Sequence, residues 1–453
     1  MEFTEKKFLV AGTGISGIGA AKLLLKKGAK VLLYDGNEKL DSGKILGQFE
    51  ETSHLSLALG TLKKEQLQGI FAMVMSPGIP CDAPFTKEVR EAGIPIWSEI
   101  ELAWQVGKGR VLAITGTNGK TTTTALVGKI MGDYFDSTFV VGNIGTPYTS
   151  VVDETKEESV IVAEISSFQL ETINEFQPSV SAVLNVTPDH LDRHKTMENY
   201  ADVKMSITKN QTSEQYCILN YDDVITREMA EKVTATPIFF SHTIEPKEGV
   251  FLREDTIYIK KDKKEEVVCK INELKLLGMH NVENVMAAVA MSIWFGVPLA
   301  SVQTSIKQFR AVEHRIEYVD TVHGVEYYND SKGTNPDAAI KGIQAMNRKT
   351  YLIGGGYDKG VPFDDWIQAF DGKVKELVLL GETANIIANT AKKYGFTNVV
   401  FVNSLLEAVR YCAKKAKEGE AVLLSPACAS WGMFRNYEER GRMFKEYVRN
   451  LKE

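Results

Sequence analysis

Short apolar runs alternate with helical stretches along most of the chain, and its first part sets the pattern. Residues 8–11 predict a strand, residues 18–27 predict a helix, and residues 30–34 predict a second strand. Further short strands are predicted at residues 69–75 and 94–97. A strand, a glycine turn, a helix and another strand in this order indicate a βαβ unit on a parallel sheet.

The same alternation begins again twice. A second region has a predicted strand at residues 110–115, a helix from Thr121, and strands at residues 159–165 and 181–186. A third region begins near Phe309, and its predicted strands are at residues 326–328, 349–353, 376–380, 399–402 and 421–424. Both regions predict parallel α/β sheets, and the third predicts a doubly wound sheet.

Residues 216–275 interrupt the alternation, because they contain short strand-like runs separated by charged turns. They predict a small antiparallel edge with a solvated hairpin, in which the Lys/Glu-rich run at 258–266 forms a surface face. We therefore expect an α/β protein of three domains. These are a Rossmann-like domain at residues 1–100, a central P-loop domain at 101–309 and a C-terminal doubly wound domain at 310–453.

The composition narrows the functional classes. The 453 residues are 44% hydrophobic and 25% charged, which is typical of globular domains. The formal net charge of -6 offers no basic excess, so we expect no nucleic-acid partner. The charged N-terminus lacks a signal-peptide core, and no apolar run reaches the roughly 18 residues of a membrane span, so we expect no membrane insertion. Five scattered cysteines suit a reducing compartment, and we expect the cytoplasm.

The first candidate motif is Gly12-x-Gly14-x-x-Gly17, which joins the first predicted strand to its helix, with Asp35 closing the next strand. Glycines in this context let backbone N–H groups approach a phosphate at a helix N-terminus. Taken alone, the motif suits an NAD-dependent oxidoreductase, another nucleotide-binding protein or a purely structural tight turn.

A second glycine loop, Gly116 to Gly119, is followed by Lys120, Thr121 and Thr122 and again lies between a predicted strand and a helix. It supplies the amides, the lysine and the hydroxyl that a nucleoside triphosphate with magnesium needs. Its first glycine lies closer to Lys120 than in the general P-loop pattern. A chance glycine turn, or a P-loop ATPase that acts as a switch or binding module, remains an alternative.

Two polar residues follow strands of this central region. Glu164 ends one predicted strand, and His190 lies just beyond another, so both are expected at the carboxyl edge of the sheet. A carboxylate and an imidazole beside a phosphate loop are suited to hold magnesium. Each residue by itself could equally be an ordinary, hydrogen-bonded polar group.

Five strings in order give the chain a wider resemblance. They are GTNGKT at 116–121, EISSFQL at 164–170, DHLD at 189–192, GMHNVEN at 278–284 and HR at 314–315. In this order they resemble the signature of the Mur ligases, and the resemblance extends from Gly12 to Arg442. It implies a UDP-binding domain, a central ATPase domain and a C-terminal domain that closes over ATP and the incoming amino acid.

The ends of the chain resemble the family members that add D-glutamate. The strings concerned are GTGISG at 12–17, SPGIP at 76–80, NDSKGTN at 329–335 and SPACAS at 425–430. The Asp-Asn-Pro-Arg string associated with diaminopimelate addition is not found, and folylpolyglutamate synthase lacks such a first domain. The resemblance implies ATP-dependent addition of D-glutamate to UDP-N-acetylmuramoyl-L-alanine through an acyl phosphate, in peptidoglycan precursor synthesis. It also implies ATP and a pair of Mg²⁺ ions as cofactors, and we expect a monomer.

The resemblance assigns roles to particular residues. The ATP contacts are Gly116, Thr117, Asn118, Gly119, Lys120, Thr121, Thr122, Asn281, Arg315 and Asp330. The contacts to the UDP substrate are Ile15, Ser16, Asp35, Ser76, Pro77, Gly78, Asn143 and His190. The D-glutamate contacts are Thr334, Lys359, Ser430, Trp431 and Tyr437. The metal ligands are Thr121, Glu164, His190 and Lys204 as a carbamate, and the catalytic residues are Lys120, His190 and Lys204.

Overall fold

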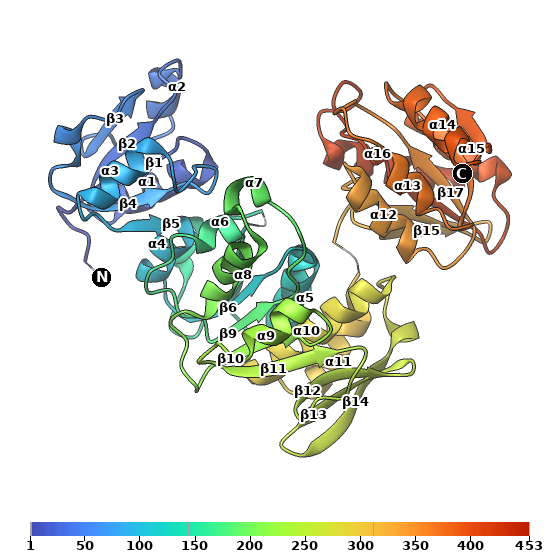
Figure 1. Ribbon diagram of the computed structural model, residues 1–453, viewed down its shortest axis with the longest axis horizontal. Coiled ribbons are helices and arrows are strands. Elements are labelled where there is room, and N and C mark those ends of the chain that lie inside the picture. Colours follow the sequence, from blue (N-terminus) through green and yellow to red (C-terminus); the bar gives the residue numbers. More distant parts are fainter. Residues whose placement is uncertain (1, 144, 311, 453) are drawn as a thin grey trace. The chain divides into compact units, whose positions relative to one another are not determined.

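The computed structural model describes residues 2–143, 145–310 and 312–452. Met1, where the first expected domain begins, and Glu453, where the third ends, therefore lie outside the described residues. The chain separates into two compact units (Figure 1). The first comprises Met1–Ile271 and Glu283–Ile306 and contains two sheets, and the second comprises Asn272–Val282 and Lys307–Glu453 and contains one. The expected α/β class is confirmed, whereas the three domain boundaries stay a prediction.

The N-terminal sheet is parallel throughout and has the strand order β3-β2-β1-β4-β5. Its strands are β1 (Lys7–Ala11), β2 (Lys30–Asp35), β3 (Leu55–Leu59), β4 (Ile70–Met75) and β5 (Ile96–Ser98). The order reverses between β1 and β4, and the crevice at such a switch point is where open α/β sheets bind ligands. The loops after these two strands touch there, because a Cβ on Gly12 would lie 2.5 Å from Ser76 Oγ.

Four helices accompany this sheet: α1 (Ile15–Lys26), α2 (Ser42–Leu46), α3 (Pro84–Glu91) and α4 (Glu99–Val106). The predicted start of the first helix at residue 18 is wrong. Gly14 is the extended N-cap, so the end of the glycine motif already forms the first helical turn. Gly14 and Gly17 concealed this turn, because glycine weakens a helical pattern in the sequence.

The central sheet has the order β14-β13-β12-β11-β10-β9-β6-β8-β7. Its strands are β6 (Arg110–Thr115), β7 (Thr138–Gly142), β8 (Val160–Glu164), β9 (Val180–Val183), β10 (Tyr216–Asn220), β11 (Thr236–Ser241), β12 (Gly249–Arg253), β13 (Thr256–Lys261) and β14 (Lys264–Lys270). Its helices are α5 (Lys120–Tyr134), α6 (Ser167–Leu170), α7 (Leu191–His194), α8 (Met197–Met205), α9 (Val224–Met229), α10 (Met279–Phe295) and α11 (Leu299–Gln308).

The prediction of an antiparallel edge across residues 216–275 is only partly right. The pairs β12–β13 and β13–β14 are antiparallel, but β10, β11 and β12 pair in parallel. The helix α9 between β10 and β11 provides the crossover that a parallel pair requires, and the charged turns of this region concealed it.

The C-terminal sheet has the order β15-β16-β20-β17-β18-β19, with β15 antiparallel to β16 and the other pairs parallel. Its strands are β15 (Glu317–Val322), β16 (Val325–Asn329), β17 (Thr350–Gly354), β18 (Val374–Leu379), β19 (Val399–Phe401) and β20 (Ala421–Leu424). Its helices are α12 (Pro336–Ala345), α13 (Asp364–Gln368), α14 (Ala384–Lys393), α15 (Leu405–Lys415) and α16 (Tyr437–Arg449). Across the described residues of all three regions, no helix is both long and apolar enough to span a membrane.

The glycine motif after β1 offers a test of local packing. We expect Gly17→Ala to destabilise the N-terminal sheet by about 1–3 kcal/mol, as overpacking does, because its Cβ would lie 1.9 Å from the Gly12 carbonyl oxygen. Gly14→Ala is the matched control, since nothing lies within 4 Å of a Cβ there. The measurement is the thermal unfolding midpoint by calorimetry. Equal midpoints for the two variants would contradict the proposed crowding.

Candidate active site

The glycine loop between β6 and α5 has a backbone that side chains rarely allow. Gly116 has φ 153° and Gly119 has φ 85°, and Gly119 forms the left-handed N-cap of α5. A Cβ on Gly119 would lie 2.2 Å from Asn284 Oδ1, and the same oxygen accepts a hydrogen bond from Thr123 Oγ1 at 3.3 Å. The loop therefore lies between its own helix α5 and α10, and a side chain at position 119 would collide with Asn284.

Two lysines converge on one carbonyl of this loop. Lys120 Nζ donates to the carbonyl oxygens of Gly116 at 2.8 Å and Thr117 at 2.9 Å, and Lys204 Nζ donates to the same Gly116 oxygen at 2.8 Å. Lys204 lies on α8 and is only 1% exposed. Burial, together with the positive charge of Lys120, lowers the pKa of Lys204 to about 7. The buried amine can therefore exist in its neutral, nucleophilic form near neutral pH.

The segment that follows β9 is tied to the glycine loop. Asn118 N–H donates to Asn185 Oδ1 at 2.8 Å, and Asn185 Nδ2 donates back to Asn118 O at 3.1 Å. Thr187 N–H donates to Thr117 Oγ1 at 3.1 Å, and that hydroxyl also lies 3.2 Å from the Tyr200 hydroxyl on α8. These bonds fix the loop against the two elements that carry the candidate metal residues.

Glu164 ends β8, where it is 2% exposed. Its Oε1 accepts a hydrogen bond from Asn143 Nδ2 at 2.9 Å, while its Oε2 is buried without a hydrogen-bond partner among the described residues. A buried carboxylate oxygen of this kind is suited to a cation. Thr121 and Thr122 lie in the first turn of α5, whose strand β6 pairs directly with β8. The residues present therefore fit a divalent cation at this edge.

His190 lies in a strained turn that aims its side chain outward. Its φ is 51°, and it forms the N-cap of the short helix α7. The half-exposed ring packs against Phe168, with ring centroids 4.9 Å apart, and its Nε2 lies 3.5 Å from Asp189 Oδ2. A left-handed non-glycine residue costs about 1–3 kcal/mol, and such residues are enriched at functional sites.

The residues expected to contact UDP gather at the switch point of the N-terminal sheet. Asp35 Oδ2 accepts hydrogen bonds from Thr13 N–H at 3.1 Å and Thr13 Oγ1 at 2.8 Å. Ile15 and Ser16 begin α1, and Ser76 Oγ is buried without a partner in the described part of the chain. Pro77 and Gly78 continue the turn that follows β4. Asn143 and His190, which were assigned to the same substrate, belong to the central region, with Asn143 beside Glu164 and His190 at the start of α7, and their assignment stays a prediction.

In the second unit, three loops meet at the carboxyl edge of the sheet. Asp330, after β16, is fully buried, and its Oδ2 accepts a hydrogen bond from Ser425 Oγ, after β20, at 2.7 Å. Gly355, after β17, donates its N–H to Pro426 O at 2.8 Å. Burial raises the pKa of Asp330 to about 7, against the opposing effects of Ser425 and of the Arg315 charge.

The residues expected to contact D-glutamate lie on these same loops. Lys359 Nζ lies 5.2 Å from the Trp431 ring centroid, and Tyr357 packs edge-on against the same ring at 5.5 Å. Ser430 is buried, and Tyr437 begins α16, where its carbonyl accepts a hydrogen bond from Ser331 Oγ at 2.8 Å. Thr334 lies in the loop after β16 and donates its N–H to Lys332 O at 2.8 Å.

Asn281 and Arg315, the remaining residues assigned to ATP, also belong to the second unit. Asn281 Nδ2 donates to Leu277 O at 2.7 Å within the first turn of α10. Its neighbour His280 is partly buried, and this burial, together with the positive charges of Arg315 and Lys341, lowers the pKa of that imidazole to about 4. The positive charges of Arg315 and Lys341 therefore act next to Asn281 in the second unit.

Comparisons with known proteins decide the family. The sequence matches the Mur ligase MurD-like N-terminal domain over residues 6–98, the Mur ligase middle domain over 114–292 and the Mur ligase glutamate ligase domain over 314–428. It is 55% identical over 453 residues to UDP-N-acetylmuramoylalanine--D-glutamate ligase of Lachnoclostridium phytofermentans, and 44% identical over 453 residues to the ligase of that name from Clostridioides difficile. Each match covers 100% of both sequences. The chain belongs to the Mur ligase family.

Solved Mur ligases share this fold. UDP-N-acetylmuramate-alanine ligase from Thermotoga maritima has a TM-score of 0.60 and 20% sequence identity, and the match covers 98% of this chain and 99% of that chain. MurF ligase from the same organism, determined in complex with ADP, has a TM-score of 0.57 and 18% identity, covering 99% of this chain and 96% of that chain. At such identities the likeness concerns the Mur ligase fold alone.

The sequence did not reveal one buried cluster of this Mur ligase. Arg193, on α7, donates to Glu171 Oε2 at 2.5 Å and to the carbonyl oxygens of Pro77 at 2.8 Å and Ile79 at 3.0 Å. Its guanidinium lies 4.1 Å from the Phe168 ring centroid. It therefore ties the turn after β4 to the helix that follows His190. The only local signal was its place directly after the DHLD string.

Arg440, on α16, was missed in the same way. It is 3% exposed and donates to Ser331 O at 2.9 Å and to Cys428 O at 3.2 Å. It thereby joins the loops that follow β16 and β20. Burial lowers the pKa of Arg440 to about 10, while the charges of Cys428 and Asp330 act in the opposite direction.

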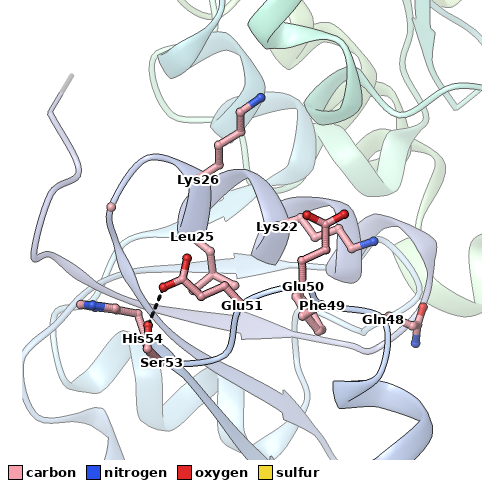
Figure 2. A pocket seen from close by; sticks show the side chains of 10 residues that line it. Lys22, Leu25, Lys26, Gln48, Phe49, Glu50, Glu51, Ser53 and His54 are labelled. Atoms are coloured by element: carbon pink, nitrogen blue, oxygen red, sulfur yellow. Dashed lines mark hydrogen bonds between the residues drawn. The ribbon is translucent and has the colours of Figure 1, made fainter.

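One cavity lies apart from the candidate residues. It has a volume of about 630 Å³ and is lined by the C-terminal half of α1 and the segment before β3, including Lys22, Phe49 and His54 (Figure 2). Because α1 begins at the carboxyl edge of the strands and runs back across the sheet, these residues lie toward the amino edge. None of the residues assigned to UDP lines this cavity.

The Arg193 cluster predicts a large loss of stability on truncation. We expect Arg193→Ala to lower the free energy of unfolding by about 3 kcal/mol, because it deprives the Glu171 carboxylate, 12% exposed, of its guanidinium partner and leaves it with contacts to Cys81 and His194. Arg253→Ala is the matched control. Arg253 bonds two carboxylates, whereas Arg193 bonds one, but its side chain is 40% exposed, so its loss should cost far less stability. Chemical denaturation measures both variants, and similar losses would contradict the role of burial.

Proposed function

We propose that this chain is a cytoplasmic, ATP-dependent ligase that adds D-glutamate to UDP-N-acetylmuramoyl-L-alanine in peptidoglycan precursor synthesis. The observation that carries the proposal is similarity along the entire length to ligases named for this reaction. The separation of candidate residues into a phosphate loop, an N-terminal switch point and a C-terminal loop cluster supports it, since the reaction requires three different substrates.

The chemistry requires activation, because a carboxylate does not condense with an amine in water at neutral pH. In the first step a carboxylate oxygen of the L-alanine residue attacks the γ-phosphorus of ATP, forming a C–O–P bond while ADP leaves. In the second step the D-glutamate amine attacks the acyl carbon, and a tetrahedral intermediate expels phosphate as the amide forms and the amine loses its proton. Positioning and neutralisation of charge are what the protein supplies to the first step.

The loop from Gly116 to Thr122 binds the phosphates in this proposal. The N–H groups of this loop lie at the N-terminus of α5, where the helix dipole favours anions. Lys120 places an ammonium group beside the transferring phosphoryl group, and Asn281, Arg315 and Asp330 bind the remainder of ATP. This arrangement stabilises the charge that develops on the phosphoryl oxygens.

Thr121, Glu164, His190 and Lys204 as a carbamate would hold a pair of Mg²⁺ ions. Bound there, the cations would neutralise phosphate and carboxylate charge. The buried Oε2 of Glu164 without a partner favours such a role. An ammonium group at Lys204 would repel these cations, whereas the neutral amine can take up CO₂ and become an anion.

The C-terminal loops hold D-glutamate in this proposal. Lys359 supplies a point charge for a carboxylate, and Thr334 and Ser430 supply directional donors. Trp431 and Tyr437 complete this group of D-glutamate contacts, and the Lys359 ammonium lies over the Trp431 ring. The UDP half of the other substrate binds at the switch point through Asp35, Ser76 and their neighbours.

A phosphate-release assay tests this function against both alternatives. We expect release to require ATP, UDP-N-acetylmuramoyl-L-alanine and D-glutamate together, and other amino acids in a panel to support little turnover. An absorbance change in the nicotinamide band would favour an oxidoreductase. Nucleotide-dependent partner binding without a peptide product would favour a switch, and either result would overturn the ligase.

Lys204 allows a sharper test of the proposed site. We expect Lys204→Ala to lower turnover by about 100-fold, the scale of losing one strong electrostatic contact, and acetate to restore part of it by replacing the missing anion. The control is Lys209→Ala, which should keep its activity, because Lys209 is exposed and lies four residues after the end of α8, the helix that contains Lys204. The measurement is steady-state turnover with acetate or chloride at equal ionic strength. Full activity of Lys204→Ala without acetate would refute the role.

A further inference from the structure

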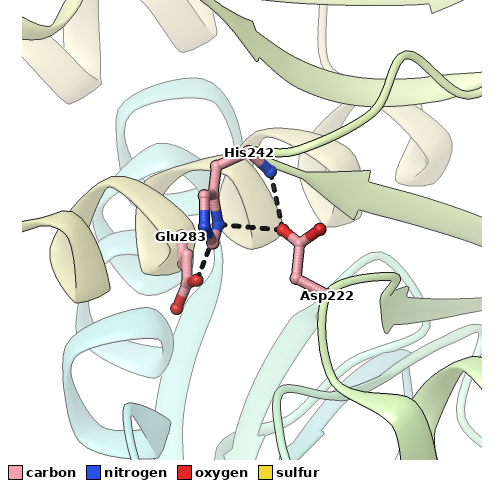
Figure 3. A group of neighbouring side chains, drawn as sticks. All are labelled: Asp222, His242 and Glu283. Carbon is pink, nitrogen blue, oxygen red and sulfur yellow. Dashed lines mark hydrogen bonds and ion pairs between the residues drawn. The ribbon is translucent and has the colours of Figure 1, made fainter.

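Three side chains outside the proposed active site converge from three elements of the first unit (Figure 3). Asp222 lies two residues after β10, His242 lies directly after the neighbouring strand β11, and Glu283 lies near the start of α10. One ligand atom from each residue lies within 4.8 Å of the other two. No role in the proposed reaction involves any of them.

Their geometry resembles a set of metal ligands more than a hydrogen-bonded triad. His242 Nδ1 lies 2.8 Å from Asp222 Oδ2 and 3.0 Å from Glu283 Oε1. This nitrogen is buried, yet it makes no well-directed hydrogen bond to the described residues, and one N–H could not serve both carboxylates fully. Donor atoms that each lie about 2.0–2.2 Å from a shared cation are separated by roughly these distances.

The surroundings orient the donors and leave negative charge in excess. Asp222 Oδ1 accepts hydrogen bonds from Ser241 Oγ at 2.6 Å and from Thr243 Oγ1, and Asp222 Oδ2 accepts one from His242 N–H at 2.7 Å. Such outer contacts hold a ligating carboxylate in place. Burial raises the pKa of Glu283, and the charge of Asp222 adds to this effect while His242 opposes it. A cation between the two carboxylates would relieve their repulsion.

We propose that Asp222, His242 and Glu283 bind a first-row divalent cation of the Zn²⁺ or Mn²⁺ class, with water completing its coordination. One imidazole and two carboxylates form a mixed nitrogen and oxygen set, which suits these ions better than Mg²⁺, whose usual ligands are oxygens. The site is separate from the Glu164 group, with which it shares no residue. Its cation joins the ends of β10 and β11 to α10 and so stabilises the first unit.

The test uses the full chain without nucleotide, in excess Mg²⁺ that occupies the proposed magnesium site. Zn²⁺ and Mn²⁺ are titrated by calorimetry, and bound Mn²⁺ is counted by electron paramagnetic resonance. We expect saturable binding of at least one ion and a higher thermal unfolding midpoint in its presence. His242→Gln should weaken binding by about tenfold or more, since even residues that only orient a ligand are worth about 10- to 100-fold.

Three further variants separate this site from other sources of binding. Glu283→Gln keeps the shape of its side chain and should also lose affinity, which tests the proposal even if His242→Gln fails to fold. His54→Gln removes an exposed histidine, and Glu164→Gln alters the proposed magnesium site, and both should retain the binding. Absence of saturable binding, as expected of a triad held only by a protonated imidazole, would overturn the proposal. So would equal affinity of the wild type, His242→Gln and Glu283→Gln.

Discussion

The carbonyl oxygen of Gly116 accepts hydrogen bonds from two lysines, and much of the central site depends on this contact. Lys120 and Lys204 both lie 2.8 Å from it, one from the helix that follows the loop and the other from α8. Two ammonium groups at one neutral acceptor repel each other, and the more buried one loses its proton more readily. The backbone of the glycine loop therefore sets the position of the Lys120 ammonium group, for which we propose a phosphate-binding role, and influences the protonation of the Lys204 amine.

A parallel sheet imposes the next constraint, because all its strands deliver their loops to the same edge. In the central sheet this edge unites the loop after β6 with Glu164 at the end of β8, and in the C-terminal sheet it unites the loops after β16, β17 and β20. The backbones meet so closely that a Cβ on Gly142 would lie 2.2 Å from Glu164 O. Glycine at such points is required by the approach of neighbouring strands as much as by the turn itself.

The same constraint explains what could be predicted from the sequence. Glycine loops and the residues that end buried strands follow from local pattern, so Lys120 and Glu164 could be chosen as candidates from it, whereas Asp330 came only from the family resemblance. The strands β3, β7 and β15 were not predicted, and each forms an edge of its sheet, where partial exposure weakens the apolar signal. Arg193 was missed for another reason. It contacts Pro77 across 116 positions of sequence, and no local pattern encodes such a partner.

Charge connects these features with the proposed reaction. The protein carries a net charge of -6, although ATP, D-glutamate and the UDP-sugar substrate are all anions. General electrostatic attraction therefore cannot bring the substrates to their sites. In the proposed sites, binding would depend instead on cations placed at individual loops, such as Lys120 beside the glycine loop and Lys359 over Trp431. Lys204 would go further, because its pKa of about 7 leaves a share of neutral amine near neutral pH, and such an amine can react with CO₂ to give an anion. A site with several anionic substrates and divalent cations would need both signs of charge close together, and Lys120 and Lys204 would provide them from two residues of the same type.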